Sequence, residues 1–145
     1  PRYERAGPAR AAWRGWEGPL AAGEQRRLTL YITGADGIEA LDLELLHETG
    51  AVKLIDVTVG DLASDFNLLF NAIGDRTIVG MYGVLPLQGS GAVLEVTVEA
   101  QRDIGRQLPL HVTASANEGR IKLTGLERVR PRTAPVRMTP GRDRN

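Results

Sequence analysis

Cysteine is absent from this chain. The absence excludes disulfide bonds, thiolate zinc sites and cysteine nucleophiles. Histidine is scarce as well, and the two present, His47 and His111, lie far apart in the sequence. Two imidazoles without a carboxylate cluster do not make a metal site. We expect His47 to end a strand, His111 to point out of one, and the chain to hold neither a metal ion nor another cofactor.

Aromatic residues make up only 5% of the sequence. The chain therefore has few aromatic residues that could form a carbohydrate-binding surface. The obvious candidates are Trp13, Trp16, Tyr31 and Tyr82. Long hydrophobic runs are also missing, since none approaches the roughly 18 residues that a membrane helix needs. We therefore expect no insertion into a membrane.

Net charge is lacking too, because 18 basic residues balance 18 acidic ones. A nucleic-acid binder normally has a basic surplus, so we expect no nucleic-acid partner. The two signs are unevenly placed, however. Arginine is concentrated near both ends of the chain and acidic residues in the middle, a pattern typical of basic flanking segments around a folded centre.

Hydrophobic and polar residues alternate through much of the centre. In the segment 38–46, IEALDLELL, the leucines Leu41, Leu43 and Leu45 fall on one side, with Asp42 and Glu44 opposite. The same period of two recurs in LTLYI, VLEVTVEA and LPLHV, and it indicates strands in a sheet with one covered face. About eight or nine such runs, separated by turns that contain glycine, predict an all-β sandwich or barrel.

One segment, residues 63–73 with the sequence ASDFNLLFNAI, has a helical alternative. Ser64 could cap a short helix whose hydrophobic residues recur near helical spacing. A strand beginning at Phe70 and Asn71 is an equally good interpretation. We expect at most one short helical turn in the whole chain.

Composition divides the chain into three parts. Residues 1–18 contain proline, glycine and two tryptophans, and we predict an arm that docks on the body through a short edge strand around Trp13 to Trp16. Residues 19–129 form the predicted sandwich. Residues 130–145 are rich in proline and arginine and poor in apolar side chains, which is typical of a linker or disordered tail.

The stretch GADGIEALDLELL has the acidic appearance of a helical calcium loop. Such a loop needs oxygen ligands at positions one, three and five, glycine at six and a carboxylate at twelve. With Asp36 at position five, positions one and three fall on Ile32 and Gly34, and position twelve on Leu43. None of these three side chains supplies a ligand, so the stretch predicts a turn that leads into a strand.

Catalytic patterns are absent from the sequence as well. There is no G-x-S-x-G and no phosphate-binding glycine loop. The carboxylate pairs Asp42 with Glu44 and Glu95 with Glu99 could be proposed as glycosidase acids, but they alternate with core residues on regular strands. The solvated face of a strand explains them better, and we expect a protein that is not an enzyme.

The order of several weak motifs resembles the cohesin domain family. The segments AAGEQRRLTLYIT and GIEALDLELLHETGAVKLIDVTVGDL resemble the opening strands of a cohesin. FNLLFNAIGDRTIVGMYG, GSGAVLEVTVEA and ASANEGRIKL resemble later strands and the Asn-Glu-Gly turn near the end of cohesin-like modules. The resemblance covers about residues 19–129. It implies a nine-stranded jelly-roll β-sandwich.

The resemblance also implies a function. Cohesins hold dockerin-bearing proteins on extracellular scaffolds through one sheet face, and the calcium of such complexes belongs to the dockerin. It implies that Asp42 contacts the partner. Ala40 matches a position on the same strand that is often polar in the family, and Gly83 lies where a dockerin-contacting strand would end. Alternation places Glu44 on the same face as Asp42, and we include Tyr82, next to Gly83, in the predicted binding face. An extracellular or cell-surface location follows from the resemblance.

The chain departs from the cohesin pattern in the segment 81–94, which is shorter than in typical cellulosomal cohesins. Two alternatives therefore stay open beside dockerin binding. One is a carbohydrate-binding module, which requires a planar row of exposed aromatic side chains and loses its main support if Trp13 and Trp16 are buried. The other is a structural surface domain without a discrete ligand, which predicts no coherent binding face.

Overall fold

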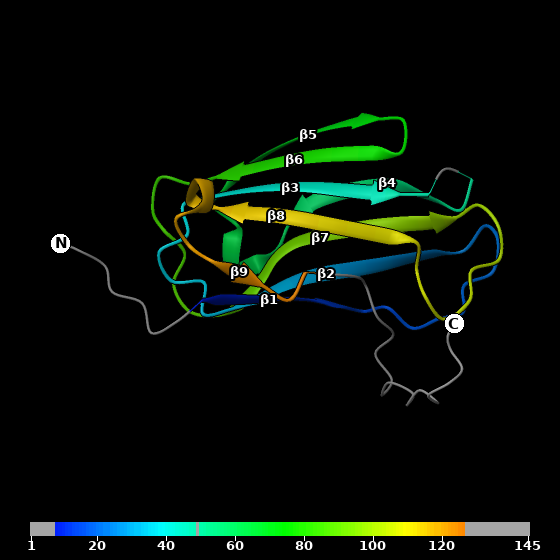
Figure 1. Ribbon diagram of the computed structural model, residues 1–145, viewed down its shortest axis with the longest axis horizontal. Coiled ribbons are helices and arrows are strands. Elements are labelled where there is room, and N and C mark those ends of the chain that lie inside the picture. Colours follow the sequence, from blue (N-terminus) through cyan, green and yellow to red (C-terminus); the bar gives the residue numbers. More distant parts are fainter. Residues whose placement is uncertain (1–7, 49, 127–145) are drawn as a thin grey trace.

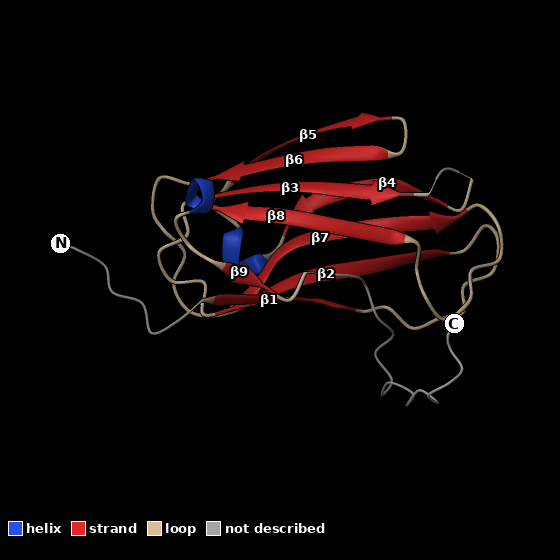
Figure 2. Ribbon diagram, in the orientation of Figure 1, coloured by secondary structure: helices blue, strands red, loops and turns tan. Residues whose placement is uncertain are grey.

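A computed structural model describes residues 8–48 and 50–126 of this chain. Two packed β-sheets make up almost all of it, and short loops gather at the two ends of the sandwich (Figures 1 and 2). The nine strands are β1 (Ala9–Arg14), β2 (Gln25–Thr33), β3 (Ala40–His47), β4 (Val52–Val59), β5 (Asn67–Ile73), β6 (Arg76–Tyr82), β7 (Gly91–Ala100), β8 (Leu110–Ala116) and β9 (Leu123–Thr124).

The two sheets differ in size. One has five strands in the order β4-β7-β2-β1-β9, and the other has four in the order β5-β6-β3-β8. Neighbouring strands are antiparallel, except that β1 and β9 run parallel. The prediction of a nine-stranded all-β sandwich is confirmed.

The hydrophobic core lies between the sheets and follows the alternation in the sequence. On β3, Leu41, Leu43 and Leu45 are buried while Asp42 between them is exposed. On the facing sheet, β7 buries Leu94, Val96 and Val98 in the same way. Removing these apolar side chains from water is the main force that holds the sheets together.

The helical alternative for residues 63–73 is wrong. A single 3₁₀ turn, η1 (Asp61–Ala63), ends at Ser64, and β5 then begins at Asn67. Pairing with β6 explains the outcome, because a two-residue turn joins β5 to β6, and Gly74 in that turn has a φ of 62°. The second 3₁₀ segment, η2 (Asn117–Gly119), contains left-handed residues and is a turn rather than a helix.

The N-terminal residues that the structure describes are part of the sandwich. β1 pairs with β2 on one side, while β9 pairs only with Ala9 and Arg10 on the other, and β1 ends at Arg14. Trp16 is 1% exposed, and its Nε1 donates a hydrogen bond to the carbonyl oxygen of Arg106 at 2.7 Å. The predicted tail at 130–145 lies outside the described residues. No helix among the described residues is long and apolar enough to cross a membrane.

Candidate functional site

The four-stranded sheet presents one face to solvent, which we call the outer face. Every second residue on its strands points away from the core, and the strand register places these residues side by side in rows. The outer face consists of Asn67, Leu69, Asn71 and Ile73 on β5, Arg76, Ile78, Gly80 and Tyr82 on β6, Ala40, Asp42, Glu44 and Leu46 on β3, and His111, Thr113 and Ser115 on β8.

The β5–β6 half of the outer face exposes four large apolar side chains, which alternate with Asn67, Asn71, Arg76 and Gly80. Leu69 is 67% exposed, Ile73 56%, Ile78 42% and Tyr82 51%. Two of the four lie on β5 and two on β6, so they share neighbouring strands. A soluble protein rarely leaves large apolar side chains together in water unless something else covers them. These four side chains could contribute the apolar part of an interface, with the neighbouring asparagines and Arg76 at its polar part.

The other half of the outer face carries the carboxylates. Glu44 Oε2 lies 2.9 Å from Nε of Arg76, and both side chains are partly exposed. Such a pair contributes little stability, about 0–1 kcal/mol, because water screens it. Asp42 is exposed, and no cation among the described residues lies within ion-pair distance of it. Its carboxylate is therefore available to a hydrogen-bond donor from outside the chain.

Gly80 lies at the centre of the outer face. The register places it between Leu69 on β5 and Asp42 on β3. A Cβ atom at this position would meet nothing nearer than Oδ1 of Asp42, at 3.8 Å, so packing within the chain does not require glycine. The missing side chain leaves a shallow gap, and glycine inside a strand often marks a place where a ligand or another backbone approaches closely.

The sequence-predicted residues Asp42, Ala40, Glu44 and Tyr82 are brought together on the outer face. Gly83 lies just past the end of β6, and a Cβ atom there would overlap the ring of Phe66. Its close approach to that ring is a packing requirement of the chain itself.

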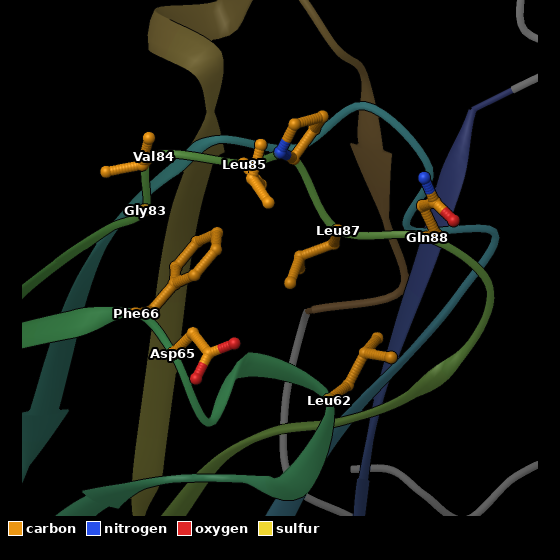
Figure 3. Close-up of a pocket in the computed structure, with 9 residues that line it drawn as sticks. Leu62, Asp65, Phe66, Gly83, Val84, Leu85, Leu87 and Gln88 are labelled. Atoms are coloured by element: carbon orange, nitrogen blue, oxygen red, sulfur yellow. The ribbon is translucent and has the colours of Figure 1, made fainter.

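A pocket of about 590 Å³ opens beside this end of β6 (Figure 3). The ring of Phe66 forms its wall, and the loop between β6 and β7 forms its rim. That loop exposes Val84 by 93% and Leu85 by 76%. The loop after β6 therefore adds apolar surface close to Tyr82 in the sequence.

The opposite end of the four-stranded sheet holds both histidines. His47 ends β3 and His111 is exposed on β8, as expected, and both border a pocket of about 310 Å³ together with Glu48 and Asp75. Neither ring nitrogen of His47 has a hydrogen-bond partner among the residues that the structure describes. In the part of the chain that the structure describes, no three histidine or carboxylate groups are placed to hold a metal ion.

Sequence reasoning missed Leu69, Ile73, Ile78 and Gly80 on the outer face. It missed Leu69 and Ile73 because the residues alone left their segment open between a helix and a strand, so its exposed side was not assigned. Gly80 did carry a signal, since glycine interrupts an otherwise β-rich run, RTIVGMYG. That signal indicates a special site only once its neighbours across the sheet are known.

The aromatic side chains do not form a carbohydrate-binding row in the described residues. Trp16 is buried, and Trp13 packs partly buried against the core. The guanidinium carbon of Arg14 lies 3.5 Å from the centre of the Tyr31 ring and covers it. Tyr82 is exposed on the other sheet. The carbohydrate-binding alternative has lost its main support.

Comparison with solved structures supports the family resemblance at the level of the fold. The non-cellulosomal cohesin of the archaeon Archaeoglobus fulgidus matches with a TM-score of 0.62 and 18% identity, over 81% of this chain and 84% of that one. The cohesin CaCohA2 of Clostridium acetobutylicum gives 0.67 and 8%, over 86% and 90%. A cohesin from the Coh-OlpA-Doc918 cohesin–dockerin complex of Clostridium thermocellum gives 0.64 and 12%, over 80% and 94%.

No protein-family model matches the chain, and no curated protein matches it in sequence. Because all three identities are low, the likeness establishes the fold and nothing finer. The chain has the jelly-roll sandwich fold of cohesin modules, as the sequence motifs predicted.

Proposed function

We propose that this chain is a non-catalytic interaction module that binds a dockerin-type protein through its outer face. The observation that carries the proposal is the cluster of exposed apolar side chains, Leu69, Ile73, Ile78 and Tyr82, on one face of a cohesin fold. In a structural surface domain without a ligand, these apolar side chains would stay exposed to water, with no partner to cover them. Solved structures of this fold include cohesins in complex with dockerins.

The composition of the outer face fits a protein partner. Protein interfaces combine a central apolar part with a polar rim. Here the apolar residues of β5 and β6 adjoin the carboxylates of β3, and Gly80 lies at the boundary between them. We expect apolar side chains of the partner to cover Ile78 and Leu69, and a partner hydroxyl, amide or basic group to bind Asp42.

Calcium in such a complex belongs to the partner. The dockerin-type module would bind it, while this chain offers no metal site among its described residues. Binding should therefore depend on calcium only through the partner. The proposed location, extracellular or at the cell surface, follows from the same function.

The test is a calorimetric titration with dockerins encoded by the same genome, in calcium and again after chelation with EDTA. We expect binding to at least one of them in calcium and none in EDTA. Asp42→Lys should weaken that binding at least tenfold, about 1.4 kcal/mol, because it reverses a charge on the outer face. Asp56→Lys is the matched control, since Asp56 is an exposed strand residue on the other sheet.

If no dockerin of that genome binds in calcium, the partner is not of the dockerin type. If Asp42→Lys and Asp56→Lys reduce the affinity equally, the outer face is not the site.

A further inference from the structure

The strand β5 forms a free edge of the four-stranded sheet. Among the described strands, β6 alone pairs with it. Natural proteins usually block such edges with charged residues, proline or a bulge, because an open edge can pair with another chain. β5 has none of these protections, since its sequence NLLFNAI is uncharged and its pairing with β6 is regular throughout. β4, at the edge of the other sheet, carries Lys53, Asp56 and a bulge.

The turn that joins β5 to β6 determines which backbone groups of β5 remain open. A two-residue turn closes on Ile73 and Arg76, and such a closing pair exchanges both of its backbone hydrogen bonds. The hydrogen-bonded positions then alternate along the strand. The N–H and C=O groups of Leu68, Phe70 and Ala72 therefore point toward the free edge.

We propose that a second copy of this chain pairs with β5 across this edge, antiparallel, about a two-fold axis at Asn71. Asn71 then lies opposite Asn71 of the second copy. Leu69 lies opposite Ile73 of the second copy, and Phe70 opposite Ala72 of it. Symmetry repeats each of the last two pairs, so the interface is self-complementary.

Two features of β5 select this partner and this register. β5 carries no charge, so pairing two copies brings no like charges together. Leu69, Phe70 and Ile73 are 67%, 51% and 56% exposed, and in this register each of them faces an apolar side chain. An axis at Phe70 would instead place asparagine opposite Leu69 and opposite Ile73.

The symmetry has a consequence for the outer face. A two-fold axis perpendicular to the sheet keeps the outer faces of both copies on the same side. The two four-stranded sheets then form one continuous sheet that can present two binding faces together. The proposed pairing does not depend on what the outer face binds.

The interface is small. Five residues of each copy lie opposite one another. Such a contact is well below the size of a standard protein interface, which buries about 1,600 Å² in total. We therefore expect a weak dimer, with a dissociation constant of about 100 µM or above.

Cysteine cross-linking tests the register directly, because the chain has no cysteine of its own. In the proposed dimer the two Asn71 residues form a non-hydrogen-bonded pair with Cα atoms about 4.5 Å apart, within the range that a disulfide spans. Asn71→Cys should therefore form a disulfide-linked dimer under mild oxidation. Leu69→Cys is the matched control, because its two copies lie four residues out of register, about 13 Å apart. Equal cross-linking of the two variants would overturn the proposal.

Sedimentation velocity tests the pairing without a cross-link. The unmodified chain should shift from monomer toward dimer between about 10 µM and about 1 mM. Phe70→Lys should remain monomeric over that range, while Val84→Lys, which adds the same charge at an exposed apolar residue outside β5, should behave like the unmodified chain. Circular dichroism checks that both variants fold. A chain that stays monomeric throughout, or a Phe70→Lys variant that dimerises normally, would contradict the proposal.

Discussion

At the scale of single residues, neighbours on one strand have separate roles. Leu43 is buried and Asp42 beside it is exposed without an ion partner among the described residues. The first contributes to the core and the second is available for binding. Alternation in the sequence was enough to assign both, because the period of a strand is two and only one face of this sheet is covered.

Gly80 gives the sharpest residue-level prediction for binding. Gly80→Val should leave the fold intact, because the space above Gly80 is open and valine favours strands. It should weaken binding of a dockerin-type partner at least tenfold, about 1.4 kcal/mol, because the new side chain fills the gap in the outer face. Calorimetry measures the affinity, and a thermal melt checks the fold.

Thr97→Val is the control for that variant, since Thr97 lies on a strand of the other sheet and points away from the core. An affinity that is the same for Gly80→Val and for the unmodified chain would exclude a close approach of the partner at Gly80.

A second residue-level prediction concerns stability. Thr77 is 1% exposed, and its hydroxyl oxygen has no hydrogen-bond partner in the described part of the chain. Burying an unpaired hydroxyl costs about 1–3 kcal/mol. Thr77→Val keeps the shape and removes the hydroxyl, so we expect the free energy of unfolding to rise by about 1 kcal/mol. Urea denaturation measures it, and a loss of stability would show that the hydroxyl is satisfied by water.

At the scale of elements, β5 marks the limit of what the sequence could predict. Its hydrophobic residues lie near helical spacing, and a strand was only one of two interpretations. Hairpin pairing with β6 decides between them, and the hydrophobic spacing within the segment does not contain that pairing. The turn signal at Gly74 was present in the sequence, between two β-rich runs.

Gly74 therefore gives the prediction at this scale. Its φ of 62° is left-handed, and a Cβ atom there would meet nothing within 4 Å. Gly74→Ala should cost about 1 kcal/mol through backbone strain alone, and hydrogen exchange should become faster at the amides of β5. Gly105→Ala is the control, because Gly105 has similar open space without a left-handed φ. Equal stability of the two variants would show that the turn does not hold β5 in place.

At the scale of the whole molecule, the sequence predicted the fold better than the site. Motif order and alternation led to the nine-stranded sandwich, and similarity to solved cohesins agrees with it. For the site, the prediction gathered Asp42, Glu44 and Tyr82 on one face but missed Leu69, Ile73 and Ile78. The missing residues adjoin Asp42 and Glu44 only because β6 pairs with β3, a strand distant in sequence, and no local pattern predicts that pairing.

The most direct test of the central claim is to map where a dockerin-type partner binds. Amide chemical shifts of the isotope-labelled chain would be followed by NMR as an unlabelled dockerin is added in calcium. We predict the largest shift changes at the amides of β3, β5 and β6, around Asp42, Leu69 and Gly80. The amides of β2 and β4 should not change. Changes centred on the five-stranded sheet, or no changes with any dockerin, would contradict the claim.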